Sequence, residues 1–197
     1  MPRVADHAQR RRQVVEATTR VMAAQGMDGP TVAEVAAEAG VSVGLVQRYF
    51  RTKDDMLLMT FEHHVADLMD RLNTSWESGG SIKQRLRRCL LEFLPLDEAR
   101  TAEVRVYLAF CGHAVSSEPL RKVQAAASAM ARASLENVVA EARERGEVPV
   151  DRDPATEAMA IWVLVDGLTM QAYADPQTMT EAAAEHVIDL HLNRLFA

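Results

Sequence analysis

Signals that start a helix recur along this chain, and they limit its fold more than any other feature of the sequence. A Ser, Thr or Asp followed three residues later by Glu, Gln or Asp has the spacing of a capping box or its near relative. The short side chain accepts a hydrogen bond from a free backbone N–H, while the acid or amide reaches back. Five segments have this spacing: Asp6 to Gln9, Thr31 to Glu34, Thr52 to Asp55, Ser81 to Gln84 and Thr178 to Glu181. Asp153 with Pro154 adds a further predicted start, with proline in the first helical position.

Signals that end a helix lie where these starts require them. Glycine supplies the left-handed turn that commonly ends a helix, and it occurs at Gly26, Gly40, the pair Gly79 and Gly80, and Gly146. No alternation of apolar and polar residues persists long enough to indicate a strand. The sequence therefore predicts an all-α fold, in which a three-helix N-terminal unit precedes a larger bundle of about six helices. The expected helices cover residues 7–25, 32–39, 43–50, 53–76, 81–94, 97–113, 117–145, 154–173 and 178–195.

Several classes of protein are excluded by simple counts. The longest stretch without Asp, Glu, Lys or Arg has twelve residues, from Val106 to Ser117, whereas a membrane-spanning helix needs about 20. No apolar segment follows the N-terminal residues as in a secretory signal. The two cysteines, Cys89 and Cys111, have no CxxC spacing, which argues against a disulfide scaffold and a zinc site. We expect a cytoplasmic protein with no membrane segment and no cofactor.

Positive and negative charges are distributed unevenly along the chain. Residues 1–53 hold eight Lys and Arg against five Asp and Glu, whereas residues 54–197 hold fourteen against twenty-three. A locally basic unit on an acidic body can bind the phosphates of nucleic acid. We therefore expect two domains, residues 1–52 and residues 53–197, of which the first is a candidate for binding nucleic acid.

The sharpest motif lies between Thr31 and Phe50. A short helix at residues 32–39 is followed by Gly40, which can adopt the left-handed conformation, and by Ser42, which can cap the next helix. Val46 and Phe50 are four residues apart and form the buried stripe of that second helix. The residues left facing outward or sideways are Gly44, Gln47, Arg48 and Tyr49. An exposed helix of this size after a tight glycine turn fits the DNA major groove, about 12 Å wide.

This segment resembles the helix-turn-helix of the TetR family of transcriptional regulators. The family pattern is met by Thr31, Gly40, Val41, Ser42, Gly44, Val46, Phe50, Lys53, Met56 and Leu57. At Gln47 and Tyr49 the chain departs from the Tyr and His of many members, and the Tyr49-Phe50 pair resembles the betaine-regulator-like branch. The C-terminal half is similar to the same branch at residues 94–98, 105–108 and 166–168.

The resemblance implies that this chain binds an operator in double-stranded DNA. Gln47 and Arg48 are candidates for base readout, because glutamine pairs with adenine and arginine with guanine. Lys53 starts a helix, whose free N–H groups already favour phosphate. The candidate DNA-binding residues are Arg10, Thr31, Ser42, Val43, Gly44, Leu45, Gln47, Arg48, Tyr49 and Lys53. The alternatives are a phosphate contact at Gln47 and Arg48, a solvated side chain at Arg10 and Lys53, and a helix cap alone at Thr31.

Family likeness also implies a homodimer through the last two helices, so that two half-sites are read. The candidate contacts are Ala158, Ile161, Trp162, Val165, Leu168 and Thr169 on one helix, with Ile188, Leu192, Leu195 and Phe196 on the other. The alternative is that these residues are ordinary core stripes.

The same likeness implies that residues 53–197 form a ligand-sensing and dimerisation domain and that this domain has a pocket for a small-molecule effector. The principal candidates are Phe61, His64, Phe93, Tyr107, Phe110, Trp162 and Asp166, and the secondary ones are Met69, His113, Met130 and Met170. At helical spacing such residues more often form a plain core.

No catalytic constellation accompanies these features. Glu62, His63, His64 and Asp67 lack the HExxH spacing of zinc proteases, and no G-x-S-x-G elbow is present. We therefore expect neither a metal site nor an enzyme. The predicted function is a repressor that a small-molecule effector releases from a palindromic operator. The alternatives are a helical adaptor whose N-terminal unit binds protein, and an effector-modifying enzyme.

Overall fold

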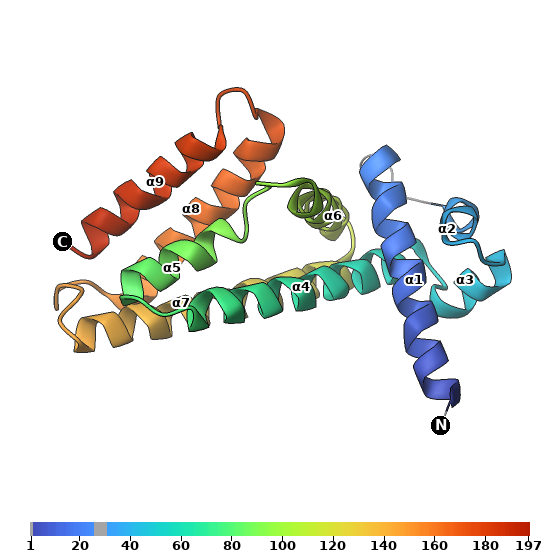
Figure 1. Cartoon of the computed structure of the whole chain (residues 1–197), viewed down its shortest axis with the longest axis horizontal. Coiled ribbons are helices and arrows are strands. Elements are labelled where there is room, and N and C mark those ends of the chain that lie inside the picture. Colours follow the sequence, from blue (N-terminus) through green and yellow to red (C-terminus); the bar gives the residue numbers. More distant parts are fainter. Residues whose placement is uncertain (1, 26–30) are drawn as a thin grey trace. The chain divides into compact units, whose positions relative to one another are not determined.

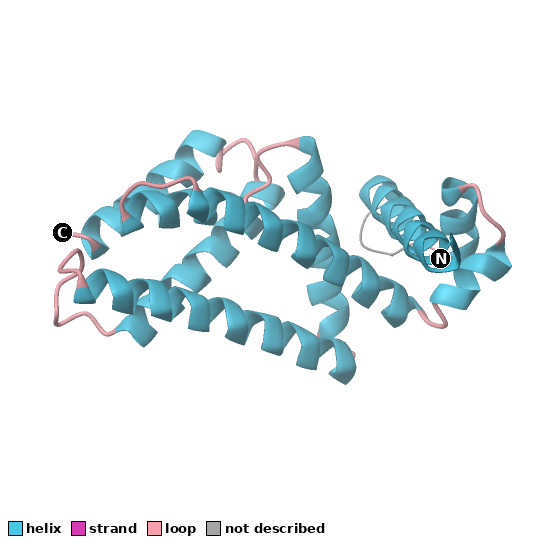
Figure 2. Ribbon diagram, turned by 60° about the horizontal axis from the view of Figure 1, so that its bottom comes forward, coloured by secondary structure: helices cyan, strands magenta, loops and turns pink. Residues whose placement is uncertain are grey.

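The computed structural model describes residues 2–25 and 31–197, and every regular element in these ranges is a helix (Figure 2). The helices are α1 (Pro2–Gln25), α2 (Val32–Ala39), α3 (Val43–Tyr49), α4 (Lys53–Glu77), α5 (Ile82–Leu91), α6 (Glu98–Ala114), α7 (Glu118–Glu144), α8 (Pro154–Ala174) and α9 (Glu181–Leu195). The predicted all-α fold, with three helices in the N-terminal unit and six after them, is confirmed in the residues that the structure describes. None of the described helices is both long and apolar enough to cross a membrane.

Most of the predicted caps form. Thr31 and Ser81 make complete capping boxes with Glu34 and Gln84. Before α4, the Thr52 hydroxyl accepts from the N–H of Asp55 at 3.0 Å. The Asp55 carboxylate in turn accepts from the N–H of Thr52 at 3.1 Å. Local spacing alone therefore determined where α2, α4 and α5 begin.

Two predicted starts and one predicted end are wrong. α1 begins at Pro2 instead of near Asp6, consistent with the preference of proline for the first helical position. α9 is capped by Thr180, whose hydroxyl accepts from the N–H of Ala183, and Thr178 belongs to the preceding turn. α5 ends at Leu91 instead of residue 94. The N–H groups of residues 92–94 donate to carbonyls three residues earlier, as in a 3₁₀ turn, and not four residues earlier as in an α-helix. The predicted stop at Gly26 lies outside the described residues.

The chain forms two compact units, and each is considered separately. The first unit comprises residues 1–67 and 102–122. Figure 1 shows α2 and α3 on one side of α1. Val14 of α1, Val35 of α2, Val46 of α3 and Met56 of α4 are among the residues that form the core there.

The second unit comprises residues 68–101 and 123–197. In it α9 runs back alongside α8, and both α8 and α5 contact α9 (Figure 1). Its core contains apolar residues at helical spacing, namely Ile82, Leu86 and Leu90 of α5, Ile161, Val165 and Leu168 of α8, and Ile188, Leu192 and Leu195 of α9. At the edge of this core, Arg87 of α5 donates to both carboxylate oxygens of Asp189 of α9, at 2.6 and 3.2 Å.

Candidate functional site

The turn between α2 and α3 is held by backbone geometry that only a few residues allow. Gly40 has φ +64°, in the left-handed region. Its N–H donates to the Ala37 carbonyl at 3.2 Å, and that of Val41 donates to the Ala36 carbonyl at 3.0 Å. These two bonds satisfy carbonyls at the end of α2. Ser42 then caps α3 by accepting from the N–H of Leu45 at 3.2 Å.

α3 buries one side and exposes the other. Val46 and Phe50 are 0% and 1% exposed, so the predicted buried stripe is confirmed. Tyr49 is only half-buried and packs against the same core. The exposed residues of α3 are Val43, Gly44, Gln47 and Arg48, while Leu45 is half-buried. The recognition face predicted from the sequence is therefore open to an external partner.

Gly44 is not required by the packing of the chain. A Cβ placed on it would have no neighbouring atom within 4 Å, and its φ is outside the positive range. Because glycine has no side chain, the backbone of α3 is exposed to solvent at this position. This is the arrangement that a close-approaching ligand, such as DNA, requires.

The other predicted DNA contacts are all accessible. Thr31 at the cap of α2, Ser42 at the cap of α3 and Lys53 at the first residue of α4 are exposed. Arg10 of α1 is also exposed, and its guanidinium donates to the Gln13 side chain at 3.2 Å. Their contacts with DNA stay predictions.

Two positioning contacts escaped the sequence analysis. The Gln13 amide of α1 donates to the Ala39 carbonyl at the end of α2 over 2.8 Å. Arg20 of α1 forms an ion pair with Glu38 of α2 at 2.6 Å. Both contacts tie the recognition motif to α1, and no sequence signal joins residues so far apart in the chain.

The candidate effector residues of the first unit form one aromatic contact. The rings of Phe61 in α4 and Phe110 in α6 stack with centroids 4.1 Å apart. His64 of α4 shares a 2.8 Å hydrogen bond with the Thr19 hydroxyl of α1, and Tyr107 is half-buried. These residues connect α4 to both α1 and α6.

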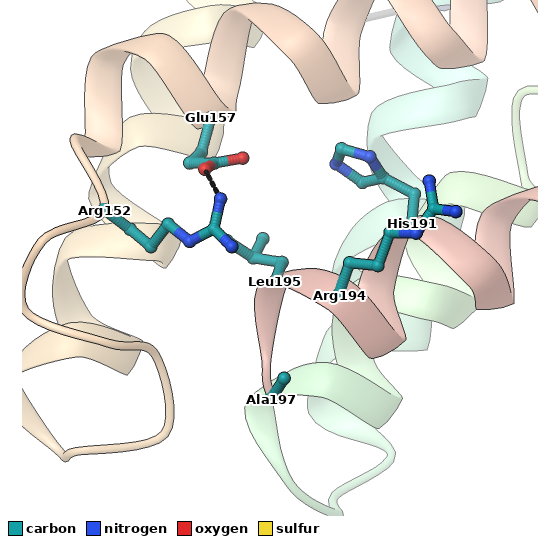
Figure 3. A pocket seen from close by; sticks show the side chains of 6 residues that line it. All are labelled: Arg152, Glu157, His191, Arg194, Leu195 and Ala197. Atoms are coloured by element: carbon teal, nitrogen blue, oxygen red, sulfur yellow. Dashed lines mark hydrogen bonds and ion pairs between the residues drawn. The ribbon is translucent and has the colours of Figure 1, made fainter.

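The candidate effector residues of the second unit form a second aromatic contact. The rings of Phe93 and Trp162 meet edge to face with centroids 5.8 Å apart. The hydroxyl of Thr169 on α8 donates to the Phe93 carbonyl at 3.1 Å. Asp166 lies on the exposed side of α8, and the secondary candidates Met69, Met130 and Met170 are also exposed. Neither of the two hollows that we describe, one beside Tyr49 and one beside His191 (Figure 3), is lined by the seven principal candidates.

Most of the predicted dimer contacts are instead core residues. Each of the following is at most 5% exposed: Ala158, Ile161, Val165, Leu168, Thr169, Ile188, Leu192 and Leu195. The plain core interpretation is therefore correct for them, because they already pack within one protomer. Trp162 and Phe196 are half-buried.

Other apolar side chains of the same two helices are exposed. Met159, Val163 and Met170 of α8 are 48%, 61% and 56% exposed, and Leu190 of α9 is 42% exposed. The α8 residues are spaced by four and seven positions, which places them on one face. This face was not predicted from the sequence.

Metal-binding groups are not gathered in the described ranges. No three His, Cys, Asp or Glu side chains in residues 2–25 and 31–197 lie close enough to hold an ion. His63 and Asp67, from the segment considered above, form a pair with 3.5 Å between nitrogen and oxygen.

Comparison with known proteins gives the same family for both halves of the chain. A model described as "Bacterial regulatory proteins, tetR family" matches residues 14–59. A model described as "BetI-type transcriptional repressor, C-terminal" matches residues 82–197.

Relatives and solved structures match over nearly the full length. The chain is 29% identical to the HTH-type transcriptional regulator PksA of Bacillus subtilis, covering 99% of this chain and 94% of that protein. It is 30% identical to the HTH-type transcriptional regulator BetI of Escherichia coli K12, covering 98% of each. A crystal structure of a transcriptional regulator from Rhodococcus sp. Rha1 has 31% identity and a TM-score of 0.83, covering 94% of this chain and 95% of that one.

Proposed function

Because this chain belongs to the TetR family of bacterial regulatory proteins and has a BetI-type C-terminal domain, we propose that it is a repressor released from a palindromic operator by a small-molecule effector. It is a DNA-binding transcriptional regulator, not an enzyme. We assign DNA binding to residues 1–52, and ligand sensing with dimerisation to residues 53–197. A repressor of this kind acts in the cytoplasm, where its operator is.

The observation that carries this proposal is the exposed face of α3. Its opposite face is anchored by Val46 and Phe50, and its first turn is fixed by the Ser42 cap. A rigid helix with an uncovered polar face suits the major groove, because readout needs side chains held in place.

Each DNA contact has a role that follows from its chemistry. Gln47 and Arg48 read base edges, while Val43 and Leu45 contact thymine methyl groups. Gly44 permits the backbone to approach. The contacts to backbone phosphate come from Arg10, Thr31, Ser42, Tyr49 and Lys53.

Dimerisation supplies the second recognition helix. We propose that the interface is made by exposed apolar side chains of the last two helices, which we call the α8–α9 face: Met159, Val163 and Met170 of α8 and Leu190 of α9. When two copies of this face pack together, apolar surface is removed from water. Each Å² of apolar surface that is buried stabilises the dimer by about 25 cal/mol. Two α3 helices on one particle then bind two half-sites, which gives the specificity that one short helix lacks.

The effector acts by changing the population of two arrangements of the helices. We assign its binding to the side chains of the first unit, where Phe61 stacks on Phe110 and His64 and Tyr107 lie on the same two helices. Phe61 and His64 belong to α4, the helix that begins at Lys53. A ligand bound at these two side chains therefore acts on the same helix that carries the proposed phosphate contact. To empty the operator, the ligand must favour the DNA-free arrangement by about 1–3 kcal/mol or more.

Selection of duplexes from a random pool identifies the operator, and its salt dependence tests the proposal. Binding through several phosphates makes the logarithm of the affinity fall steeply and linearly with the logarithm of salt concentration. Arg48→Ala lowers affinity for the selected duplex by about tenfold or more, since a bidentate base contact contributes about 1–3 kcal/mol. Arg121→Ala, at an exposed arginine of α7, is the control. DNA binding through α3 would be rejected if the unchanged protein, Arg48→Ala and Arg121→Ala bound the duplex with equal affinity and that affinity did not depend on salt.

A further inference from the structure

Gln13 of α1 is half-buried, and both polar atoms of its side-chain amide are bonded within the first unit. The amide nitrogen donates to the Ala39 carbonyl at 2.8 Å, and the amide oxygen accepts from the Arg10 guanidinium at 3.2 Å. A carbonyl can only accept and a guanidinium can only donate, so both partners require the same orientation of the amide. One neutral side chain therefore joins the end of α2 to an exposed cation of α1.

The bond to Ala39 belongs to the end of α2. The last four carbonyls of a helix have no N–H partner within that helix. In α2, backbone N–H groups of the following turn donate to the Ala36 and Ala37 carbonyls, and the Gln13 amide donates to the Ala39 carbonyl. Because Ala39 directly precedes the turn that leads to α3, the Gln13 amide has a fixed place relative to α3.

The bond to Arg10 gives an exposed side chain a preferred direction. An arginine on a helix surface samples many rotamers, and ordering such a side chain on binding costs affinity. A bond that already exists in the DNA-free protein removes part of this cost. The guanidinium has five N–H donors, so it can bond to Gln13 and to a phosphate at the same time.

The next arginine of α1 is directed elsewhere. The Arg11 guanidinium donates to the Met59 sulfur at 3.0 Å and lies 4.0 Å from the Glu62 carboxylate. Both of these partners belong to α4. Arg11 is therefore engaged with α4, whereas Arg10 bonds to the side chain that holds the end of α2.

We propose that Gln13 is a positioning residue, which aligns Arg10 with a backbone phosphate of the operator and fixes that contact relative to α3. This inference rests on the DNA binding proposed above, in which Arg10 contacts phosphate. Phosphate contacts set the register of a protein on its duplex, while base contacts read the sequence. The Gln13 amide thus links a contact that sets the register to the helix that reads the bases.

The order of the Arg10 side chain in the DNA-free, full-length protein gives the first test. Gln13→Met removes both hydrogen bonds without a change of charge, and methionine has about the helix propensity of glutamine. The nitrogen-15 heteronuclear NOE of the Arg10 Nε–H, assigned with Arg10→Ala, reports this order. We expect it to fall in Gln13→Met. Thr19→Val, which removes a 2.8 Å hydrogen bond between α1 and His64 of α4, retains it. An Arg10 side chain that is equally ordered in Gln13→Met overturns the proposal.

A double-mutant cycle on the affinity for the selected duplex gives the second test, read by fluorescence anisotropy. Gln13→Met lowers affinity by about threefold more in the unchanged protein than in Arg10→Ala, because the two substitutions remove one shared contact. A loss that is equal in both backgrounds means that Gln13 acts through Ala39 alone, and it overturns the proposal, as does the absence of any loss. If the unchanged protein binds no duplex, the proposed function itself is refuted, and this inference with it.

Discussion

The Ser117 hydroxyl, just before α7, donates a 2.8 Å hydrogen bond to the Asp54 carboxylate in the first turn of α4. Asp54 directly follows Lys53, the proposed phosphate contact at the start of that helix. The bond therefore ties the end of α4 that carries Lys53 to the segment between α6 and α7. Both residues lie in the first unit.

Loss of this bond is expected to weaken operator binding. Ser117→Ala frees the first turn of α4 and lowers affinity by about threefold, in keeping with a partly exposed hydrogen bond of about 0.5–1.5 kcal/mol. Fluorescence anisotropy with the selected duplex measures the change. Ser116→Ala is the matched control, because its hydroxyl donates only to the nearby His113 carbonyl. Equal affinities of the two variants would show that the bond does not position α4.

Two glycine substitutions separate folding from DNA binding. Gly40→Ala forces a side chain into the left-handed region and destabilises the fold by about 1–2 kcal/mol. Gly44→Ala removes glycine from a helix and stabilises the fold by about 0.5–1 kcal/mol. Urea unfolding measures both free energies.

The same two variants differ in operator affinity. Gly44→Ala lowers it, because the new methyl group lies on the face that approaches DNA. A Gly44→Ala protein that is more stable and binds with undiminished affinity would place the DNA on another surface.

The cap of α8 makes stability depend on pH. Asp153 accepts from the hydroxyl and the N–H of Thr156, and these hydrogen bonds lower the pKa of its carboxyl below the ordinary 3.8. A group with a depressed pKa stabilises the fold above its unfolded pKa, and this contribution is lost as the pH falls through the folded pKa.

Asp153→Asn tests this cap, since asparagine caps a helix but does not titrate. The urea midpoint of the unchanged protein falls more than that of Asp153→Asn between pH 7 and the acid range below the ordinary pKa. Asp153→Ala lowers the midpoint already at pH 7. Identical acid dependence of the unchanged protein and Asp153→Asn would contradict the assignment.

The α8–α9 face is tested by a charge placed on it. Val163→Glu puts a carboxylate in the centre of the proposed interface and weakens the dimer by about thirtyfold or more, as expected for a contact of about 2 kcal/mol. Sedimentation equilibrium measures the dimer dissociation constant. Met130→Glu of α7 is the control, because Met130 is also exposed. If Val163→Glu dimerises like Met130→Glu, the interface lies elsewhere.

Local signals explain what could be predicted from the sequence. Caps such as Thr31 with Glu34 depend on residues three positions apart, and Gly40 ends α2 by its own backbone conformation. The exposed face of α3 followed from the spacing of Val46 and Phe50. These features need no knowledge of the rest of the fold.

The exposed side of α8 could not be predicted in this way. The helix is apolar around most of its circumference, so Ile161 in the core and Val163 on the surface look alike in sequence. Only the packing of α5 and α9 determines which side is buried. The Ser117–Asp54 and Arg87–Asp189 bonds join residues 63 and 102 positions apart, and no periodicity reveals such pairs.

The central claim is that two α3 helices of one dimer bind two half-sites at once. Its most direct test compares the selected operator with a duplex carrying five extra base pairs between the half-sites. Because a helical turn is about 10–10.5 base pairs, the insertion turns one half-site to the opposite side of the duplex. We predict that affinity falls to that of a duplex with a single half-site. Unchanged affinity for the longer duplex would contradict the account.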